Sequence, residues 1–409
     1  MDGVANKAAT LTVIIFANLF IYFPSSPTIA IVGVAEQAHY EGIVDKMKVY
    51  LVGGAVRDRL LGRPHKENDW VVVGSTPEEM AEQGFRPVGK DFPVFLHPET
   101  HEEYALARTE RKTSKGYHGF VFHAAPDVTL EEDLKRRDLT MNAIAQNDQG
   151  KLIDPFDGKR DIENKLFRHV SSAFEEDPVR LLRVCRFSAM LPDFNTAPET
   201  LELMKNMVKA GEVDALVPER VWQELKQALG YERPDQFFET AARCGALKTI
   251  FSEIKEISTT LSALKKAAEL SDDAHVRFAA AFGQLSPGDA KQLCQRLRIP
   301  NNYAGLLQLV ANHHSAIESL PDSPGDILNL LEKLDPFRRP ERFERCLLAT
   351  DAIYRSKHNK ALPTLDLLNK AYKVCKTVNL DNIDKQSSGT EIAETIRKLR
   401  LDKIKEALK

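Results

Sequence analysis

A pair of glycines between an apolar strand pattern and a helical pattern most constrains how this chain folds. Lys48–Val52 is short, apolar and rich in β-branched residues, which is typical of a buried strand, and Gly53-Gly54 interrupts it. Residues 55–61 then have the spacing of a helix. Glycine lets a backbone approach a ligand closely, and the start of a helix favours an anion. The segment therefore predicts an anion-binding turn at Gly54, and Arg57 lies near enough to reach the same anion.

Carboxylates accompany the next predicted strand, Asp69–Val73. Side chains alternate along a strand with a period of two, so Glu67 and Asp69 project from one face. Two carboxylates at a strand end suit Mg2+ ions better than they suit a core. Glu103, at the start of a further predicted strand over residues 103–108, is a candidate third catalytic carboxylate. The alternative is a polar approach to the strand with no metal.

Arginine and aspartate stand together in the segment Arg136-Arg137-Asp138. Arginine forks bind phosphate oxygens, and a carboxylate can accept a hydrogen bond from a ribose hydroxyl. The segment fits a nucleotide site, and it fits a solvated charge cluster or a capping Asp138 equally well.

A second mixed cluster begins at Asp177-Pro178, which is a good helix start. Asp177, Arg180, Arg183 and Arg186 follow one another at intervals of three, so neighbours in the series touch. Cytosine and adenine both present an amine donor beside a ring-nitrogen acceptor, and a carboxylate next to a guanidinium complements that pair. Asp177 and Arg180 are therefore candidate base readers. Taken alone, the residues favour the simpler alternative, a capped helix with an ion pair.

The chain of 409 residues is long enough for two to four domains. Strand patterns end near Glu175, and helical spacing continues from there almost to the last residue with no convincing strand. We predict an α+β protein with a mixed-sheet head (47–174) followed by a long helical remainder (175–409). Breaks are expected near residues 230–234, 287–288 and 322–324.

Composition narrows the environment and the partners. A net charge of −3 means that any surface for nucleic acid is local. Five scattered cysteines without a CxxC pair fit a reducing compartment, so we expect a cytoplasmic protein without a cysteine-built zinc site.

The first 46 residues are unlike the rest of the chain. Residues 8–35 carry no charge, and residues 11–23 are nearly all apolar until Pro24. A signal peptide or membrane anchor is one interpretation. We favour a dispensable or non-native extension with no membrane association, because Met47 would open directly into the first strand.

In their order along the chain, these motifs resemble those of the class II CCA-adding enzymes, the tRNA nucleotidyltransferases of the DNA polymerase β-like superfamily. The motifs are Gly-Gly-Ala-Val-Arg-Asp (53–58), Glu-x-Asp (67–69), Arg-Arg-Asp (136–138) and Glu-Asp-x-x-Arg (176–180). The match is most similar to the gammaproteobacterial type and covers residues 47 to the end. Glu67 stands where many relatives have Asp.

The resemblance implies a polymerase β-like head and addition of C, C and A to the 3' end of tRNA from CTP and ATP, including repair of damaged ends. It implies Mg2+ at Glu67 and Asp69, and tRNA rather than DNA as the nucleic acid, bound by a monomer or homodimer. The implied nucleotide-binding residues are Gly54, Arg57, Arg137, Asp138, Asp177, Arg180, Arg183 and Arg186. The resemblance also implies that the helical remainder is divided into a neck (175–232), a body (233–320) and a tail (321–409). The implied tail includes a basic helix over residues 391–409.

Other functions stay open on the sequence. The same scaffold could belong to a poly(A) polymerase or to an A-only or CC-only adding enzyme, and a non-catalytic tRNA-binding protein is a third class. Many such relatives carry a phosphohydrolase domain with a His-Asp metal pair, but Gly283-Gln284 stands where that pair would align. We therefore predict no phosphohydrolase activity.

Overall fold

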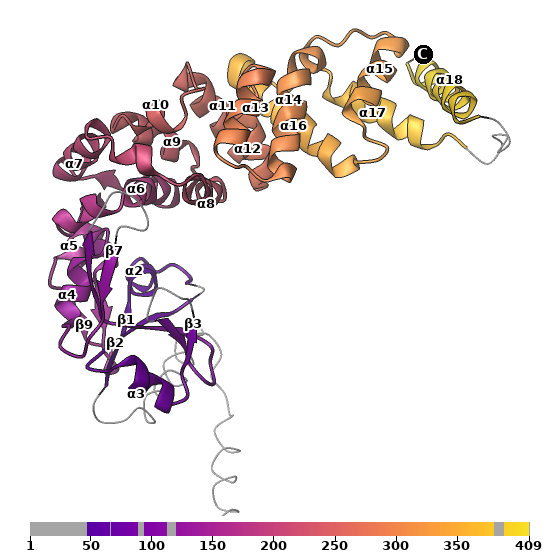
Figure 1. Ribbon diagram of the computed structural model, residues 1–409. Helices are drawn as coiled ribbons and strands as arrows, with labels where there is room; N and C mark the ends of the chain where they lie inside the picture. Colours follow the sequence, from indigo (N-terminus) through magenta and orange to yellow (C-terminus); the bar gives the residue numbers. More distant parts are fainter. Residues whose placement is uncertain (1–46, 66, 89–93, 113–119, 380–387, 409) are drawn as a thin grey trace, which may run out of the picture.

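The computed structural model describes residues 47–65, 67–88, 94–112, 120–379 and 388–408. The molecule is elongated and bent: a sheet-containing head lies at one end, and helices continue from it along an arc to the tail (Figure 1). The predicted α+β class, with a mixed-sheet head before a helical remainder, is confirmed. The apolar extension over residues 1–46 lies outside the described residues.

A seven-stranded mixed sheet with the order β3-β4-β5-β2-β1-β8-β9 forms the centre of the head. The predicted strands at Lys48–Val52 and Asp69–Val73 are present as β1 and β2. The other strands of this sheet are β3 (Arg86–Val88), β4 (Val94–Leu96), β5 (Glu103–Leu106), β8 (Ala145–Gln146) and β9 (Leu152–Ile153). A separate hairpin pairs β6 (Thr109–Lys112) with β7 (Phe120–His123). Residues 113–119, between these two strands, lie outside the described range.

The register of β1, β2 and β5 brings the carboxylates together at one end of these strands. β1 runs antiparallel to β2, with Val52 opposite Asp69. β5 runs parallel to β2, with Glu103 opposite Asp69. Directly opposed residues share a face of a sheet, so Asp69 and Glu103 project together. The end of β1, where the glycine turn begins, therefore lies beside these carboxylates.

Short helices cover the head sheet: α2 (Gly54–Leu60), α3 (Pro77–Glu82), α4 (Leu130–Lys135) and α5 (Gly158–Glu163). A capping box begins α3: the side chains of Thr76 and Glu79 each accept a hydrogen bond from the other residue's backbone N–H. Leu51, Val72, Met80 and Tyr104 are buried in the main core, which continues into the first helices of the neck.

Helices make up most of the chain after Glu175. They are α6 (Val179–Met190), α7 (Pro198–Lys209), α8 (Pro218–Leu229), α9 (Asp235–Arg243), α10 (Ala246–Ile250), α11 (Ile257–Leu270), α12 (Ala274–Phe282), α13 (Pro287–Arg296), α14 (Asn301–Glu318), α15 (Pro324–Leu334), α16 (Pro340–His358), α17 (Leu365–Lys376) and α18 (Gly389–Ala407). A second apolar core joins α11, α12 and α14 to the tail helices. None of the helices in the described ranges is long and apolar enough to cross a membrane.

Two sequence predictions in this half need correction. A strand does follow Glu175: β11 (Asn195–Thr196) pairs in parallel with β10 (Leu166–Phe167). The break expected near Pro287 is confirmed as an interruption between α12 and α13, because Pro287 begins α13 and Ser286 caps it. The helix expected to start at Pro178 begins at Val179. The breaks near 230–234 and 322–324 are confirmed.

Candidate active site

Gly53 makes the tight turn between β1 and α2. Its φ of 71° and ψ of −128° lie in a region that side-chain-bearing residues rarely adopt. A Cβ atom at this position would lie 3.0 Å from Nη1 of Arg137 and 3.8 Å from Oδ2 of Asp69. Glycine is needed here both for the backbone conformation and for the close approach of these two side chains. The turn thus places a guanidinium and a carboxylate against the backbone.

Glu67 and Asp69 are both exposed to solvent at this turn. Desolvation by the surrounding protein raises the pKa of the Asp69 carboxyl, and the Glu67 carboxylate adds to the rise, against the opposing effect of Arg137. Mutual repulsion between two exposed carboxylates is what a divalent cation relieves, so the pair fits a hard ion such as Mg2+. Within the described ranges, no three acidic, histidine or cysteine side chains are gathered closely enough to hold a metal. The role of Glu103 as third ligand stays a prediction.

Arg57 is held in place by partners on both sides of its guanidinium. Nε and Nη2 donate to the two carboxylate oxygens of Asp58, each at 2.9 Å. Nη1 donates to Oδ1 of Asn142 at 2.7 Å. Arg57 is only 6 % exposed, so water does not compete for these hydrogen bonds and they fix the orientation of its guanidinium. Its predicted place beside the glycine turn is confirmed, and Gly54 lies directly against it, with a built Cβ 3.5 Å from Nη2.

Asp138 connects the Arg136–Asp138 segment to the neck helix α6. Its Oδ2 accepts from Nε of Arg183 at 2.7 Å, while Oδ1 accepts from the Leu139 backbone N–H at 2.8 Å and from Nδ2 of Asn142 at 3.0 Å. Burial raises the pKa of this carboxyl, but Arg183 and these hydrogen bonds outweigh it and hold the pKa well below its usual range. Asp138 is therefore not the solvated charge that the sequence left open.

Arg136 and Arg137 share one buried acidic partner, Asp133 of α4. Nη2 of Arg136 donates to Asp133 Oδ1 at 2.6 Å, and Nη2 of Arg137 donates to Oδ2 at 3.2 Å. Nε of Arg137 is buried without a hydrogen-bond partner. A buried donor with no partner is unfavourable, so this nitrogen fits a site that a ligand completes.

Three arginines surround the buried ring of Phe187 on α6. The guanidinium carbons of Arg57, Arg183 and Arg186 lie 5.2, 5.6 and 4.4 Å from the ring centroid. Nε of Arg186 also donates to Glu224 of α8 at 2.6 Å. Cations stack favourably on an aromatic face, so Phe187 concentrates positive charge at the junction of head and neck. Such a cluster suits a polyanion.

The two candidate base readers have separate partners. Asp177 accepts from both Nη atoms of Arg220 on α8, at 3.1 and 2.8 Å, and from the Val179 backbone N–H at 3.0 Å. Nη1 of Arg180 donates to the Ala173 carbonyl at 2.8 Å. The prediction that Asp177 is the N-cap of α6 is wrong by one position, because the N-cap is Pro178. Asp177 still accepts from the Val179 backbone N–H, and its bidentate ion pair is made with Arg220.

The structure thus brings most predicted residues to one region at the junction of the head and α6. The sequence motifs missed the supporting partners: Asp58, Asp133, Asn142, Phe187, Arg220 and Glu224. Asn142 and Phe187 lie only four and one residues beyond predicted site positions, so proximity was a usable signal. Arg220 and Glu224 lie on another helix, and nothing in the earlier motifs points to them.

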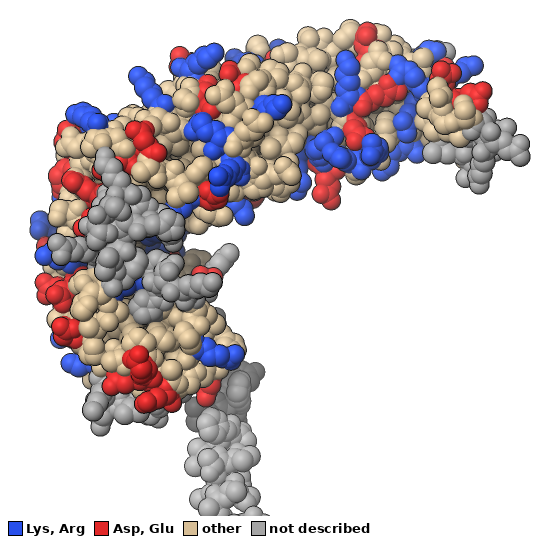
Figure 2. All heavy atoms as spheres, viewed as in Figure 1, with Lys and Arg blue, Asp and Glu red and all other residues tan. Residues whose placement is uncertain are grey.

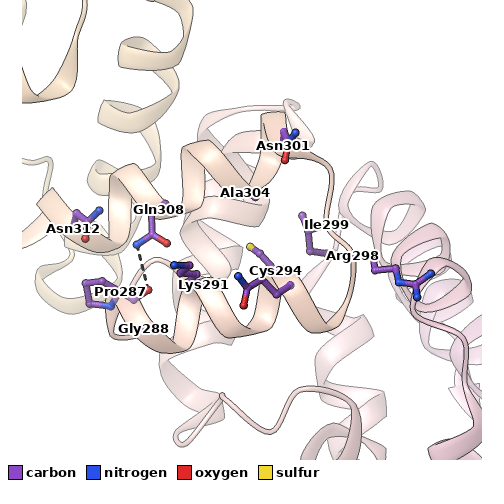
Figure 3. A pocket seen from close by; sticks show the side chains of 11 residues that line it. Pro287, Gly288, Lys291, Cys294, Arg298, Ile299, Asn301, Ala304, Gln308 and Asn312 are labelled. Carbon is purple, nitrogen blue, oxygen red and sulfur yellow. Dashed lines mark hydrogen bonds between the residues drawn. The ribbon is translucent and has the colours of Figure 1, made fainter.

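A separate groove of about 870 Å³ lies between α13 and α14 and shares no residue with this site. Figure 3 shows Lys291, Cys294 and Gln308 along it, with Gln308 bonded to the Pro287 carbonyl at 3.2 Å. Arg298 at its far end makes an ion pair with Glu219 of α8.

Comparison with known proteins agrees with this geometry. Residues 49–168 match the family model of the poly A polymerase head domain, and residues 193–258 match that of a probable RNA and SrmB-binding site of polymerase A. The chain is 52 % identical over 364 residues to a CCA-adding enzyme of Coxiella burnetii, covering 88 % of this chain and 96 % of that one. It is 50 % identical over 405 residues to a multifunctional CCA protein of Thioalkalivibrio sulfidiphilus, covering 88 % and 98 %.

Comparison of the fold with solved structures also finds CCA-adding enzymes. A solved structure of the Thermotoga maritima CCA-adding enzyme complexed with tRNA-CCA superposes with a TM-score of 0.65 at 21 % identity, covering 94 % of this chain and 96 % of that one. Sequence identity over nearly the full length of the Coxiella protein, together with the shared fold, establishes that this chain belongs to the family of CCA-adding enzymes.

Proposed function

We propose that this chain adds C, C and A to the 3' end of tRNA, using CTP and ATP without a nucleic-acid template, and repairs damaged ends in the same way. The tRNA 3'-hydroxyl attacks the α-phosphate of the nucleotide, and pyrophosphate leaves. The observation that carries the proposal is the meeting of Asp69 and Arg137 at the Gly53 turn, because it sets carboxylate and cationic groups around one space. Membership of the family supports the choice of tRNA.

Glu67 and Asp69 would hold Mg2+, with Glu103 as a further ligand. When bound, Mg2+ would neutralise charge on the triphosphate and activate the attacking hydroxyl. The fit rests on hard oxygen donors, on the solvent exposure of both carboxylates and on the nearness of Glu67 to Asp69.

The protein's own cations would orient the nucleotide. Arg57 and Arg137 lie beside the glycine turn and would bind phosphate oxygens. Arg183 and Arg186 extend the positive region around Phe187, and Asp138 would receive the ribose hydroxyl while it orients Arg183. Asp177 and Arg180 would select the base through the amine and ring nitrogen that C and A share.

Incorporation of labelled nucleotide into tRNA tests the proposal. A tRNA lacking its last three nucleotides should accept C from CTP alone, nothing from ATP alone, and the full end from both. A CC-only enzyme would stop before A, an A-only enzyme would require a tRNA ending in CC, and a poly(A) polymerase would extend with ATP alone.

Asp69→Ala should abolish incorporation of both nucleotides and leave tRNA binding largely intact, because the carboxylate acts on the nucleotide and metal. Asp148→Ala removes an exposed carboxylate from the same domain and serves as control. Incorporation by Asp69→Ala at the rate of that control would refute the metal assignment. A wild-type chain that binds tRNA and incorporates neither nucleotide would favour the non-catalytic alternative.

A further inference from the structure

Arg220 is the partner that orients the proposed base-reading carboxylate. It comes from α8, 43 positions along the chain from Asp177, and packing of α8 against α6 brings it there. Its two terminal nitrogens each meet a different oxygen of Asp177, at 3.1 and 2.8 Å. A fork of this kind fixes the plane of a carboxylate, which a single donor does not.

The Val179 backbone N–H adds a third constraint on the same group. It donates to Oδ1 of Asp177 at 3.0 Å, so one oxygen is fixed by two donors and the other by one. Each carboxylate oxygen accepts in about two directions, which leaves acceptor capacity on Oδ2. The Asp177 side chain keeps 20 % of its surface exposed, so a ligand can still reach it.

We propose that Arg220 is a positioning residue that sets base selectivity by holding Asp177 as an oriented acceptor. The inference rests on the proposed function, in which Asp177 reads the amine of C or A. A carboxylate accepts hydrogen bonds and donates none, so it pairs with that amine and leaves the carbonyl of U or G unpaired. Without the fork, Asp177 can rotate about its side-chain bonds, and the distinction between amine and carbonyl weakens.

Selectivity is the readout that separates this role from a general structural one. The kcat/KM for CTP, UTP and GTP should be measured on tRNA lacking its last three residues, and the kcat/KM for ATP, UTP and GTP on tRNA lacking only the final A. Arg220→Gln should reduce the preference for CTP and ATP over UTP and GTP by roughly 10- to 100-fold, the range that loss of a hydrogen bond to a charged group produces. Glu219→Gln is the matched control, since this neighbouring residue on α8 makes its own ion pair with Arg298 and none with Asp177.

Two further variants keep the test decisive. Arg220→Lys retains the charge but cannot make both contacts, so it should lose selectivity as well, even where Arg220→Gln does not fold. Asp177→Asn combined with Arg220→Gln should be no less selective than Asp177→Asn alone, because both changes remove one function. Thermal unfolding of each variant checks that the fold survives.

The outcomes separate the inference from the proposed function. A wild-type chain that incorporates neither CTP nor ATP overturns the function and this inference with it. A selective wild-type chain whose Arg220→Gln and Arg220→Lys variants keep wild-type selectivity overturns the inference alone. Loss of selectivity in those variants, with Glu219→Gln unchanged, supports it.

Discussion

Gly53 carries both a backbone and a packing requirement, and the two can be separated by mutation. Gly53→Ala would strain the backbone by about 1–3 kcal/mol and would push a methyl group against Nη1 of Arg137, 3.0 Å away. Gly62 has a φ of 65° but nothing within 4 Å of a built Cβ, so Gly62→Ala isolates the backbone effect. We expect both variants to lose stability in urea and only Gly53→Ala to lose most nucleotide incorporation. Equal incorporation by the two would show that the contact with Arg137 is unimportant.

The buried Asp138 predicts a pH-dependent contribution to stability. Its folded-state pKa is depressed, so its stabilisation is fully present above the unfolded pKa, near 4, and is lost as pH falls through the folded value. Asp138→Asn should lower the free energy of unfolding at pH 7 by about 1.5–3 kcal/mol, and the gap from wild type should narrow below about pH 4. Urea titrations from pH 7 to 3 measure both. Asp148→Asn, which changes an exposed carboxylate, serves as the control. A difference in the free energy of unfolding between wild type and Asp138→Asn that stays constant with pH would contradict the depressed pKa of Asp138.

For single residues, the sequence indicated candidate site residues better than it indicated the residues to which they form hydrogen bonds. Period-two spacing predicted that Glu67 and Asp69 share one face, because a strand's alternation is local. The strand β2 begins at Asp69, so the placement of Glu67 stays a prediction. The bond from Arg57 to Asn142 spans 85 positions, and the pair of Asp177 and Arg220 spans 43, so only the packed fold reveals them. The ion pair of Asp177 with Arg220 of α8 is one that the spacing of the motif did not predict.

At the scale of the elements, tertiary packing rather than helix propensity explains why a glycine, Gly283, stands at the end of α12. A Cβ on Gly283, at the end of α12, would lie 2.5 Å from the Ala279 carbonyl, 2.6 Å from Val310 and 2.9 Å from Ile353. α14 and α16 therefore press directly on this backbone. We expect Gly283→Ala to destabilise the chain by about 1–3 kcal/mol. Gly305→Ala, on α14 with open space around it, should be neutral or stabilise by up to about 1 kcal/mol in the same urea experiment.

The same contacts bear on the predicted lack of phosphohydrolase activity. A histidine at 283 would need the space that Val310 and Ile353 occupy. His314 on α14 has its Nδ1 near the Val310 carbonyl at 3.1 Å, and burial lowers its pKa. We expect no turnover in a nickel-dependent phosphatase assay of the purified chain, with a relative that carries the His-Asp pair as positive control. Robust turnover would overturn this prediction.

Helices and strands were predicted where the sequence pattern is strong, and they were missed where two strands pair over only two residues. β1 and β2 were predictable because four of the five residues in each are apolar or β-branched, which signals a buried strand. β11 has two residues, and its pairing with β10 depends on backbone partners almost 30 positions away, at Leu166 and Asn195. Strands this short leave no periodic signal.

At the scale of the whole molecule, charge is distributed unevenly over the bent chain. Figure 2 shows lysines and arginines gathered toward the tail end of the visible face, with acidic residues among them. The helix predicted as basic, α18, is largely neutralised: Lys403 pairs with Glu406, Lys405 with Asp402, and Arg397 with Glu332. Spacing alone could not show which charges remain available to a polyanion.

The pairing in the tail leads to a prediction about tRNA affinity. Lys373 and Lys376 are exposed in the last turn of α17, whereas Lys403 and Lys405 have acidic partners three positions away. Replacing Lys373 and Lys376 by alanine should weaken tRNA binding and reduce the slope of log K against log salt by about 1–2, since each phosphate contact contributes almost one. The Lys403→Ala and Lys405→Ala pair should change the slope less, because those charges are already compensated locally. Binding isotherms at several salt concentrations measure this, and a larger effect from the α18 pair would place the RNA against that helix instead.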